Sequence, residues 1–357
     1  MPRSPQPNTK SKYCSRCNKT VSKANFARHQ RWHQNAHQVT CPVYAYKKEI
    51  QRAGGLSQLQ STNTSIWNGI GLRAPFLFPA TECWVEKPTR QHYMSDLILN
   101  SNEGTAVFRR GSPRQPLDSL HIFDVIQQLD HPDIGSAICA VNMTAQLPKA
   151  RIPERLYGKF PIYEESLEVK TNITPKFSGL DLHVDCGAHG ITLLHSACVK
   201  LWALYPLTEK NYSLLAEVYK SNAMFIELQG RLEGGEFCIQ TEEDAIYLPP
   251  GCIHSTITLR GGLTPGIMFT TAECVKPAGL IWDMDNNTKR HRDDCVYFLR
   301  AIELGLCSRD EDQRQEALSE LCGRYRQIAK VRRGEMSILS SLPRQCCRCN
   351  KLWSAHR

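Results

Sequence analysis

Three pairs of a histidine and an aspartate two residues apart could each contribute two ligands to a metal ion. The pairs are His131 with Asp133, His183 with Asp185, and His291 with Asp293. The first pair flanks Pro132 at the predicted end of a short helix, "LDSLHIFDVIQQLDHPDIG". The third pair lies at the charged start of another predicted helix, where solvated side chains are expected. The surroundings therefore favour the middle pair as a metal site.

The middle pair lies in "LDLHVD", a strand-like segment in which residues two apart share a face, so His183 and Asp185 point to the same side. His254 follows in "DAIYLPPGCIHSTITL", which predicts a strand, a turn and a second strand. Two imidazoles and one carboxylate on one face of a metal leave the opposite face open. That arrangement suits ferrous iron that binds a chelating cosubstrate and dioxygen together. Lys200, in the otherwise apolar "CVKLWALYP", could hold the far carboxylate of such a cosubstrate.

The elements that must position these residues are short strands between 177 and 271, which predict a barrel or a sandwich. Further strand-like segments are "ITLLHSA", "VKLWALY", "AMFIELQG" and "STITLRGG". We expect His189 and His195 to pack or form hydrogen bonds rather than to bind metal, and Trp202 to be a core residue. Helices are predicted at "NTKRHRDDCVYFLRAIELGL" and "DEDQRQEALSELCGRYRQIAKVRR".

The segments "LDLHVD", "ITLLHSACVKLWALYP" and "DAIYLPPGCIHSTITL" together resemble a Jumonji C (JmjC) domain, from the cupin-like family of Fe(II)- and 2-oxoglutarate-dependent oxygenases. The resemblance covers about residues 120 to 275. It implies a mainly β fold, with a double-stranded β-helix (cupin or jelly-roll-like) barrel and flanking helices. It also implies that His183, Asp185 and His254 bind iron, that Lys200 binds the C5 carboxylate of 2-oxoglutarate, and that Thr192 is a polar cosubstrate contact.

The activity that the resemblance implies is hydroxylation or demethylation of a protein side chain, with a histone tail as one candidate substrate. The two reactions use the same residues, so the sequence does not separate them. Two alternatives stay open. One is a catalytically inactive barrel that serves as a chromatin or nucleic-acid adaptor, and the other is a metal-dependent isomerase or storage barrel.

The N-terminus contains "YCSRCNKTVSKANFARHQRWH", in which Cys14, Cys17, His29 and His33 have nearly the spacing of a two-Cys two-His zinc finger. Four such ligands can close a tetrahedron around Zn(II) and stabilise so small a unit. One residue fewer than usual separates the second Cys from the first His, and His37 and Cys41 are substitute ligands. The tail's "CCRCNK" nearly repeats the finger's "CSRCNK": Cys346, Cys347, Cys349 and His356 form either half of a second site or a disordered segment.

The net charge of +9 is concentrated at the N-terminus, because residues 1–48 contain ten Lys or Arg and no Asp or Glu. A basic, Cys-bearing segment favours a polyanionic partner such as DNA or RNA. No stretch approaches the roughly 18 apolar residues of a membrane span. We expect no membrane partner, and a nuclear or otherwise cytoplasmic protein, in which clusters with metal-ligand spacing are a better interpretation of the 16 cysteines than disulfides.

The predicted organisation has five parts. They are a basic zinc finger (1–48), a linker with capping elements (49–115), the JmjC-like barrel (116–275), C-terminal helices (276–335) and a basic Cys-rich tail (336–357).

Overall fold

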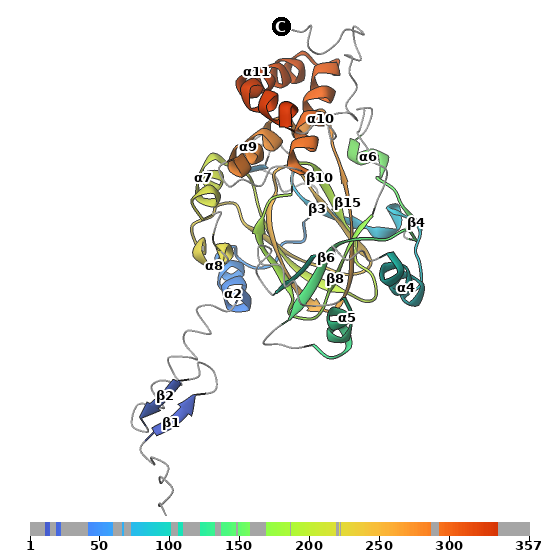
Figure 1. Cartoon of the computed structure of the whole chain (residues 1–357), viewed down its shortest axis with the longest axis vertical. Coiled ribbons are helices and arrows are strands. Elements are labelled where there is room, and N and C mark those ends of the chain that lie inside the picture. Colours follow the sequence, from blue (N-terminus) through green and yellow to red (C-terminus); the bar gives the residue numbers. More distant parts are fainter. Residues whose placement is uncertain are drawn as a thin grey trace, which may run out of the picture.

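The computed structural model of the protein describes most of the chain (Figure 1). The described residues are 11–14, 19–22, 42–59, 66–67, 73–100, 106–109, 122–132, 137–147, 149–157, 169–185, 187–218, 221, 223–286 and 293–334. In this part of the chain no helix is both long and apolar enough to cross a membrane.

Two antiparallel sheets dominate the fold, as expected for a mainly β protein with flanking helices. The larger has the order β3 (Phe76–Pro79), β13 (Asp244–Leu248), β10 (His189–Thr192), β15 (Gly262–Phe269), β8 (Lys170–Thr174), β6 (Ile138–Thr144) and β5 (Ala106–Arg109). The smaller has the order β12 (Glu236–Gln240), β11 (Val199–Tyr205), β14 (Ile253–Arg260) and β9 (Gly179–His183). From β8 to β15 the chain alternates between the two sheets, except that β11 and β12 are successive strands that pair within the smaller one, with α7 (Glu209–Val218) and α8 (Met224–Glu227) in the connection between them.

An apolar cluster lies between the two sheets. Trp202 and Leu204 of β11 pack with Ile246 and Leu248 of β13, and Trp67 joins them. Because side chains alternate along a strand, this cluster identifies which residues of each strand face the space between the sheets.

Helices cover the outer faces of both sheets (Figure 1). The smaller sheet packs against α2 (Pro42–Arg52), α7 (Glu209–Val218), α8 (Met224–Glu227) and α9 (Val275–Asn286). The larger sheet packs against α4 (Arg90–Asn100) and α5 (Ile122–Asp130) at its β6 and β8 end, and near β3 against α6 (Glu154–Tyr157). Two short strands, β4 (Trp84–Glu86) and β7 (Lys149–Ala150), form a separate pair.

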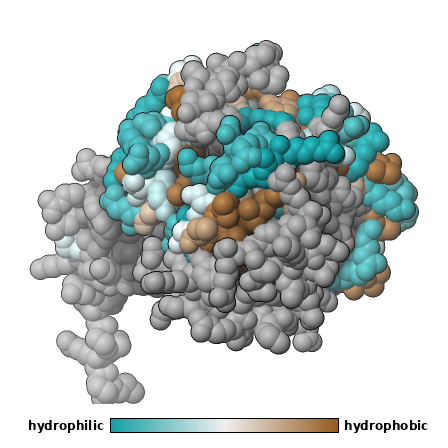
Figure 2. Space-filling model, turned by 90° about the horizontal axis from the view of Figure 1, so that it is seen from above, coloured by the Kyte–Doolittle hydropathy of each residue, from teal (hydrophilic) through white to brown (hydrophobic). Residues whose placement is uncertain are grey.

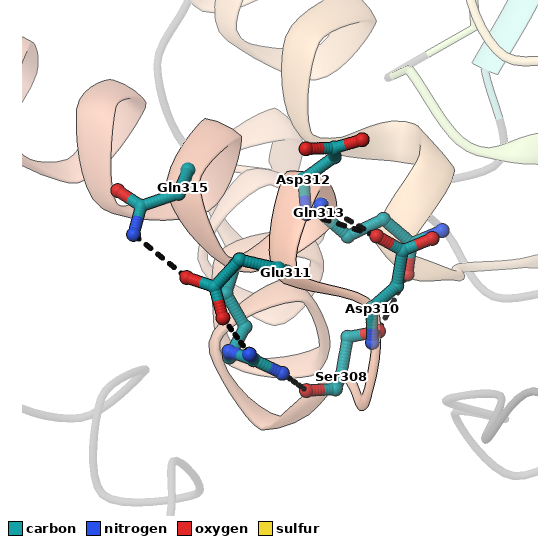
Figure 3. A network of polar contacts seen from close by, with 7 residues as sticks. Ser308, Asp310, Glu311, Asp312, Gln313 and Gln315 are labelled. Atoms are coloured by element: carbon teal, nitrogen blue, oxygen red, sulfur yellow. Dashed lines mark hydrogen bonds and ion pairs between the residues drawn. The ribbon is translucent and has the colours of Figure 1, made fainter.

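The C-terminal helices α10 (Asp293–Cys307) and α11 (Glu311–Gly334) pack with α9 around a cluster of Trp282, Phe298 and Ile302, against which Leu321 of α11 also packs. Seen from this end, the described surface is largely hydrophilic, with a smaller apolar group (Figure 2). The carboxylate of Asp310 begins α11, because its Oδ1 accepts the backbone N–H of Asp312 at 2.9 Å (Figure 3). Such a side-chain acceptor satisfies an N–H that has no partner within the helix.

Several predicted elements are confirmed, and one is wrong. Strand β11 coincides with "VKLWALY", and α5, α10 and α11 lie in segments predicted as helices. The apolar run "AMFIELQG" was expected as a strand, but it contains the short helix α8. The reason is a tertiary contact: the Asp181 carboxylate accepts the backbone N–H groups of Met224 and Phe225 at 2.7 and 2.8 Å.

Residues 49–115 do more than the linker and capping role expected of them. They supply β3 and β5, both of which pair within the larger sheet. Of the described cysteines, Cys83, Cys139, Cys198, Cys238, Cys252, Cys274 and Cys322 are free. Cys307 is disulfide-bonded, which the expectation of metal-binding clusters in preference to disulfides does not account for.

Candidate metal centre

His183, Asp185 and His254 come together at one end of β9 and β14. His183 is the last residue of β9 and lies directly opposite His254. The Nε2 atoms of the two histidines lie 3.7 Å from the two carboxylate oxygens of Asp185. One potential ligand atom from each residue falls within 4.8 Å of the others, so the group could hold a metal ion. The three residues that the sequence predicts as ligands are therefore assembled in one site.

Backbone carbonyls orient both imidazoles. Nδ1 of His183 lies 2.8 Å from the carbonyl oxygen of Asp181, and Nδ1 of His254 lies 3.0 Å from that of Cys252. A carbonyl can only accept, so each Nδ1 carries the proton and each Nε2 keeps a lone pair. Hydrogen bonds of this kind fix the tautomer of metal-binding histidines.

The burial of His254 favours its neutral form. Desolvation, with a further contribution from the neighbouring His183, lowers the pKa of His254 to about 4. Its ring lies 4.1 Å from that of His183 and 5.8 Å from Trp202, measured between centroids. A neutral imidazole is the form that binds a metal.

Lys200 projects into the space between the two sheets. It lies opposite Thr258 of β14 and Gln240 of β12, two residues from Trp202, which packs against Ile246 of the other sheet. Lys200 is only 2% exposed, and burial lowers the pKa of its ammonium. Among the described residues its ammonium has no hydrogen-bond or ion-pair partner. An unpaired buried charge is costly, so the site favours an anion.

Thr192, the other residue predicted to contact the cosubstrate, lies on β10 of the larger sheet, whereas β11 with Lys200 belongs to the smaller one. Thr192 is opposite Ile246 of β13 and therefore faces the space between the sheets. Gln240, the neighbour of Lys200, donates from Nε2 to the carbonyl oxygen of Thr192 at 2.7 Å. The Gln240 amide also accepts the indole N–H of Trp202 at 2.9 Å.

Thr256 is a site residue that the sequence did not single out. It lies on β14 between His254 and Thr258, on the same face, and opposite Trp202. Thr258, which pairs with Lys200, lies four residues after His254 on β14, a distance of about 13 Å along the strand. The buried Thr256 Oγ1 has no hydrogen-bond partner among the described residues. The Thr256 hydroxyl thus lies, without a hydrogen-bond partner in the described part of the chain, between the Lys200 ammonium and the triad of His183, Asp185 and His254.

The two other nearby histidines, His189 and His195, form hydrogen bonds with other residues of the protein, as expected. His189 has its ring nitrogens 2.7 Å from the Tyr247 hydroxyl and 2.8 Å from the Thr271 hydroxyl, and burial lowers its pKa to about 3. His195 lies 2.8 Å from the carbonyl oxygen of Pro88. Neither histidine has a free ring nitrogen directed at the triad.

The predicted zinc site falls largely outside the described residues. Cys14 ends β1 (Ser11–Cys14), which pairs with β2 (Lys19–Ser22) in an antiparallel hairpin. Cys17, His29, His33 and the substitute ligands His37 and Cys41 lie outside the described residues, as does the Cys-rich tail with Cys346, Cys347, Cys349 and His356. The zinc finger therefore stays a prediction.

Comparisons with known proteins do not identify a family. No protein-family model matches the chain, and a search of curated proteins finds no similar sequence.

Proposed function

We propose that the protein is an Fe(II)- and 2-oxoglutarate-dependent oxygenase that hydroxylates or demethylates a protein side chain. The observation that carries the proposal is the combination, in one interior, of the His183, Asp185 and His254 group with the unpaired ammonium of Lys200. A metal site alone would fit many proteins. A buried cation on the same inner face of the sheet suits a cosubstrate that binds the metal at one end and carries a carboxylate at the other.

We further propose that β8 to β15 form a double-stranded β-helix. The support is the strand order, since β8, β15, β10 and β13 are neighbours in one sheet and β9, β14, β11 and β12 in the other. Alternation of successive strands between two facing antiparallel sheets is typical of jelly-roll barrels. The triad then lies at the open end of the barrel and Lys200 deeper inside.

The donor set fits Fe(II) and 2-oxoglutarate. Two imidazoles and a carboxylate leave coordination positions free, and the unused Thr256 hydroxyl could donate to a bound polar ligand. When bound, the iron and 2-oxoglutarate together supply the oxidation of a C–H bond by dioxygen, with succinate and carbon dioxide as coproducts. The chain's own residues hold this assembly in place: Lys200 binds the distal carboxylate, Thr192 and Thr256 offer polar contacts, and the apolar cluster around Trp202 excludes water.

Succinate formation tests the proposal. Protein loaded with Fe(II) without oxygen, then exposed to air with 2-oxoglutarate, should form succinate even without substrate, and His183→Ala should not. Histone peptides, with and without N-methyl-lysine, should raise the rate if a histone tail is the substrate. Succinate at the level of the His183→Ala control, in correctly folded protein, would refute the oxygenase and favour a binding module.

The basic N-terminal segment favours a second function, the binding of nucleic acid. Residues 1–48 contain ten basic residues and no acidic residue, and the Cys and His residues of "YCSRCNKTVSKANFARHQRWH" have nearly the spacing of a zinc finger. A single finger contacts about three base pairs, so we propose that this segment tethers the protein to chromatin or RNA without strong sequence preference.

A further inference from the structure

A β-bulge lies immediately behind the metal centre. His254 pairs with His183 and Thr256 pairs with Leu180, so two residues of β9 stand opposite the single residue Ser255 of β14. A bulge redirects the side chains that follow it. Here the bulge sets the position of His183 opposite His254. A hydrogen bond that holds the bulge in place therefore also positions His183.

Ser255 fastens the bulge from the outer face of the sheet. Its hydroxyl donates to the carbonyl oxygen of Leu180 at 2.8 Å, which links β14 to β9 across the irregular pairing. The Tyr46 hydroxyl in turn donates to Ser255 Oγ at 2.8 Å. The phenol, the serine hydroxyl and the carbonyl therefore form one buried chain of hydrogen bonds from α2 to β9.

Tyr46 is held firmly in that position. It is 1% exposed, and its ring packs 4.4 Å from that of Phe225 on α8, the helix that neighbours α2 (Figure 1). It shares an apolar cluster with Leu182 of β9 and Ile253 of β14, each next to a proposed ligand. Asp181 is one of the two bulged residues of β9, and its carboxylate accepts the backbone N–H groups of Met224 and Phe225 in α8.

We propose that Tyr46 is a positioning residue of the metal centre, acting through Ser255 on the bulge that places His183 opposite His254. The helix that follows the predicted zinc ligands thus contributes to a site more than 130 residues away in the sequence. The proposal rests on the proposed function insofar as the triad binds a metal.

Tyr46→Phe tests the proposal because it removes only the hydroxyl. Loss of a hydrogen bond made directly to a metal ligand typically weakens metal binding about 10- to 100-fold, and because Tyr46 acts further out, through Ser255 and Leu180, we expect an effect at the low end of that range. We expect the dissociation constant for Co(II), used as an air-stable probe of the triad, to rise about 10-fold, with a changed visible spectrum. In metal-free protein labelled with ¹⁵N-histidine, the His183 Nδ1–H signal, assigned by its loss in His183→Ala, should shift or broaden.

Tyr93→Phe is the matched control. Tyr93 on α4 is equally buried, and its hydroxyl lies 2.5 Å from Thr171 Oγ1 on the larger sheet. This variant should lose comparable thermal stability yet keep the native Co(II) affinity and His183 signal. Equal behaviour of the two variants in both readouts would overturn the proposal. If the unmutated protein itself binds no Co(II) at the triad, the proposed function fails, and the His183 signal alone decides whether Tyr46 positions this residue.

Discussion

At the scale of single residues, the site is defined by buried polar groups that form no hydrogen bonds with one another. Lys200 and Thr256 lie between the sheets with unused hydrogen-bonding capacity, and Thr256 shares its face of β14 with His254, one of the three potential metal ligands. Such groups lower the stability of a folded protein unless a ligand pairs with them. Stability and ligand binding should therefore respond in opposite directions when these groups are removed.

Replacing Lys200 with methionine is the first prediction. The change removes the buried charge but keeps an unbranched apolar stem, so the melting temperature should stay the same or rise. The dissociation constant for 2-oxoglutarate should rise by about 100-fold or more, because a charge-assisted contact in a buried site is worth about 3 kcal/mol. Calorimetry on Mn(II)-loaded protein measures both, with Lys276→Met on the exposed start of α9 as the control.

Thr256→Val is the second prediction. Valine has nearly the shape of threonine, and the hydroxyl that it replaces has no partner among the described residues, so the melting temperature should stay the same or rise slightly. Affinity for 2-oxoglutarate should fall several-fold, as for the loss of one hydrogen bond of about 1 kcal/mol. Unchanged 2-oxoglutarate binding in this variant would remove Thr256 from the cosubstrate site.

The sequence allowed the ligands to be predicted but not the residues that support them. His183 and Asp185 are recognisable from their spacing, and His254 and Lys200 from their places in strand-like segments. Strand alternation does not place Asp185, because β9 ends at His183. The roles of Thr256 and Tyr46 depend on a missing partner and on a contact across 209 residues. Neither property leaves a local pattern in the sequence.

At the scale of elements, local patterns identified strands with strong alternation and failed where tertiary contacts decide. The helix α8 exists because Asp181 caps it, although its apolar residues fit a strand equally well. Strand β15 contains three residues that usually interrupt strands, Gly262, Pro265 and Gly266, and it still pairs on both sides. Helix α9 lies almost wholly within the stretch assigned to C-terminal helices, and its Pro277 is compatible with the first turn of a helix.

The start of α11 gives the third prediction. Asp310→Ala removes the acceptor for the N–H of Asp312, and we expect it to lower the free energy of unfolding by about 1 kcal/mol. Asp310→Ser keeps a capping oxygen and should retain most of that stability. Chemical denaturation measures the difference. An equal loss of stability in both variants would show that the lost stability does not come from the capping hydrogen bond.

At the scale of the whole molecule, α2 joins the basic N-terminal segment to the sheet that carries the proposed metal ligands. Tyr46 packs against that sheet and lies within the region assigned to the zinc finger on sequence grounds. The end of the basic segment and the start of the folded domain therefore overlap. A truncation through residue 48 would remove both the basic arm and a residue that contacts the back of the site.

Two truncations separate these contributions and form the fourth prediction. Removal of residues 1–41 should weaken binding to duplex DNA and flatten its salt dependence, because fewer phosphates are neutralised, while 2-oxoglutarate turnover is retained. Removal of residues 1–52 should impair both activities, since α2 is lost. Filter binding at several salt concentrations and a succinate assay measure the two outcomes. Full turnover after the longer truncation would contradict a role for α2 in the site.

The central claim is that His183, Asp185, His254 and Lys200 form a single site for Fe(II) and 2-oxoglutarate. The most direct test is the visible absorption of the protein with both added in the absence of oxygen, since direct chelation of Fe(II) by 2-oxoglutarate produces a charge-transfer band. We predict a band that saturates at one equivalent of iron, is lost in His183→Ala, and requires far more 2-oxoglutarate in Lys200→Met. A protein that binds Fe(II) but develops no such band, or a band unaffected by either substitution, would contradict the account.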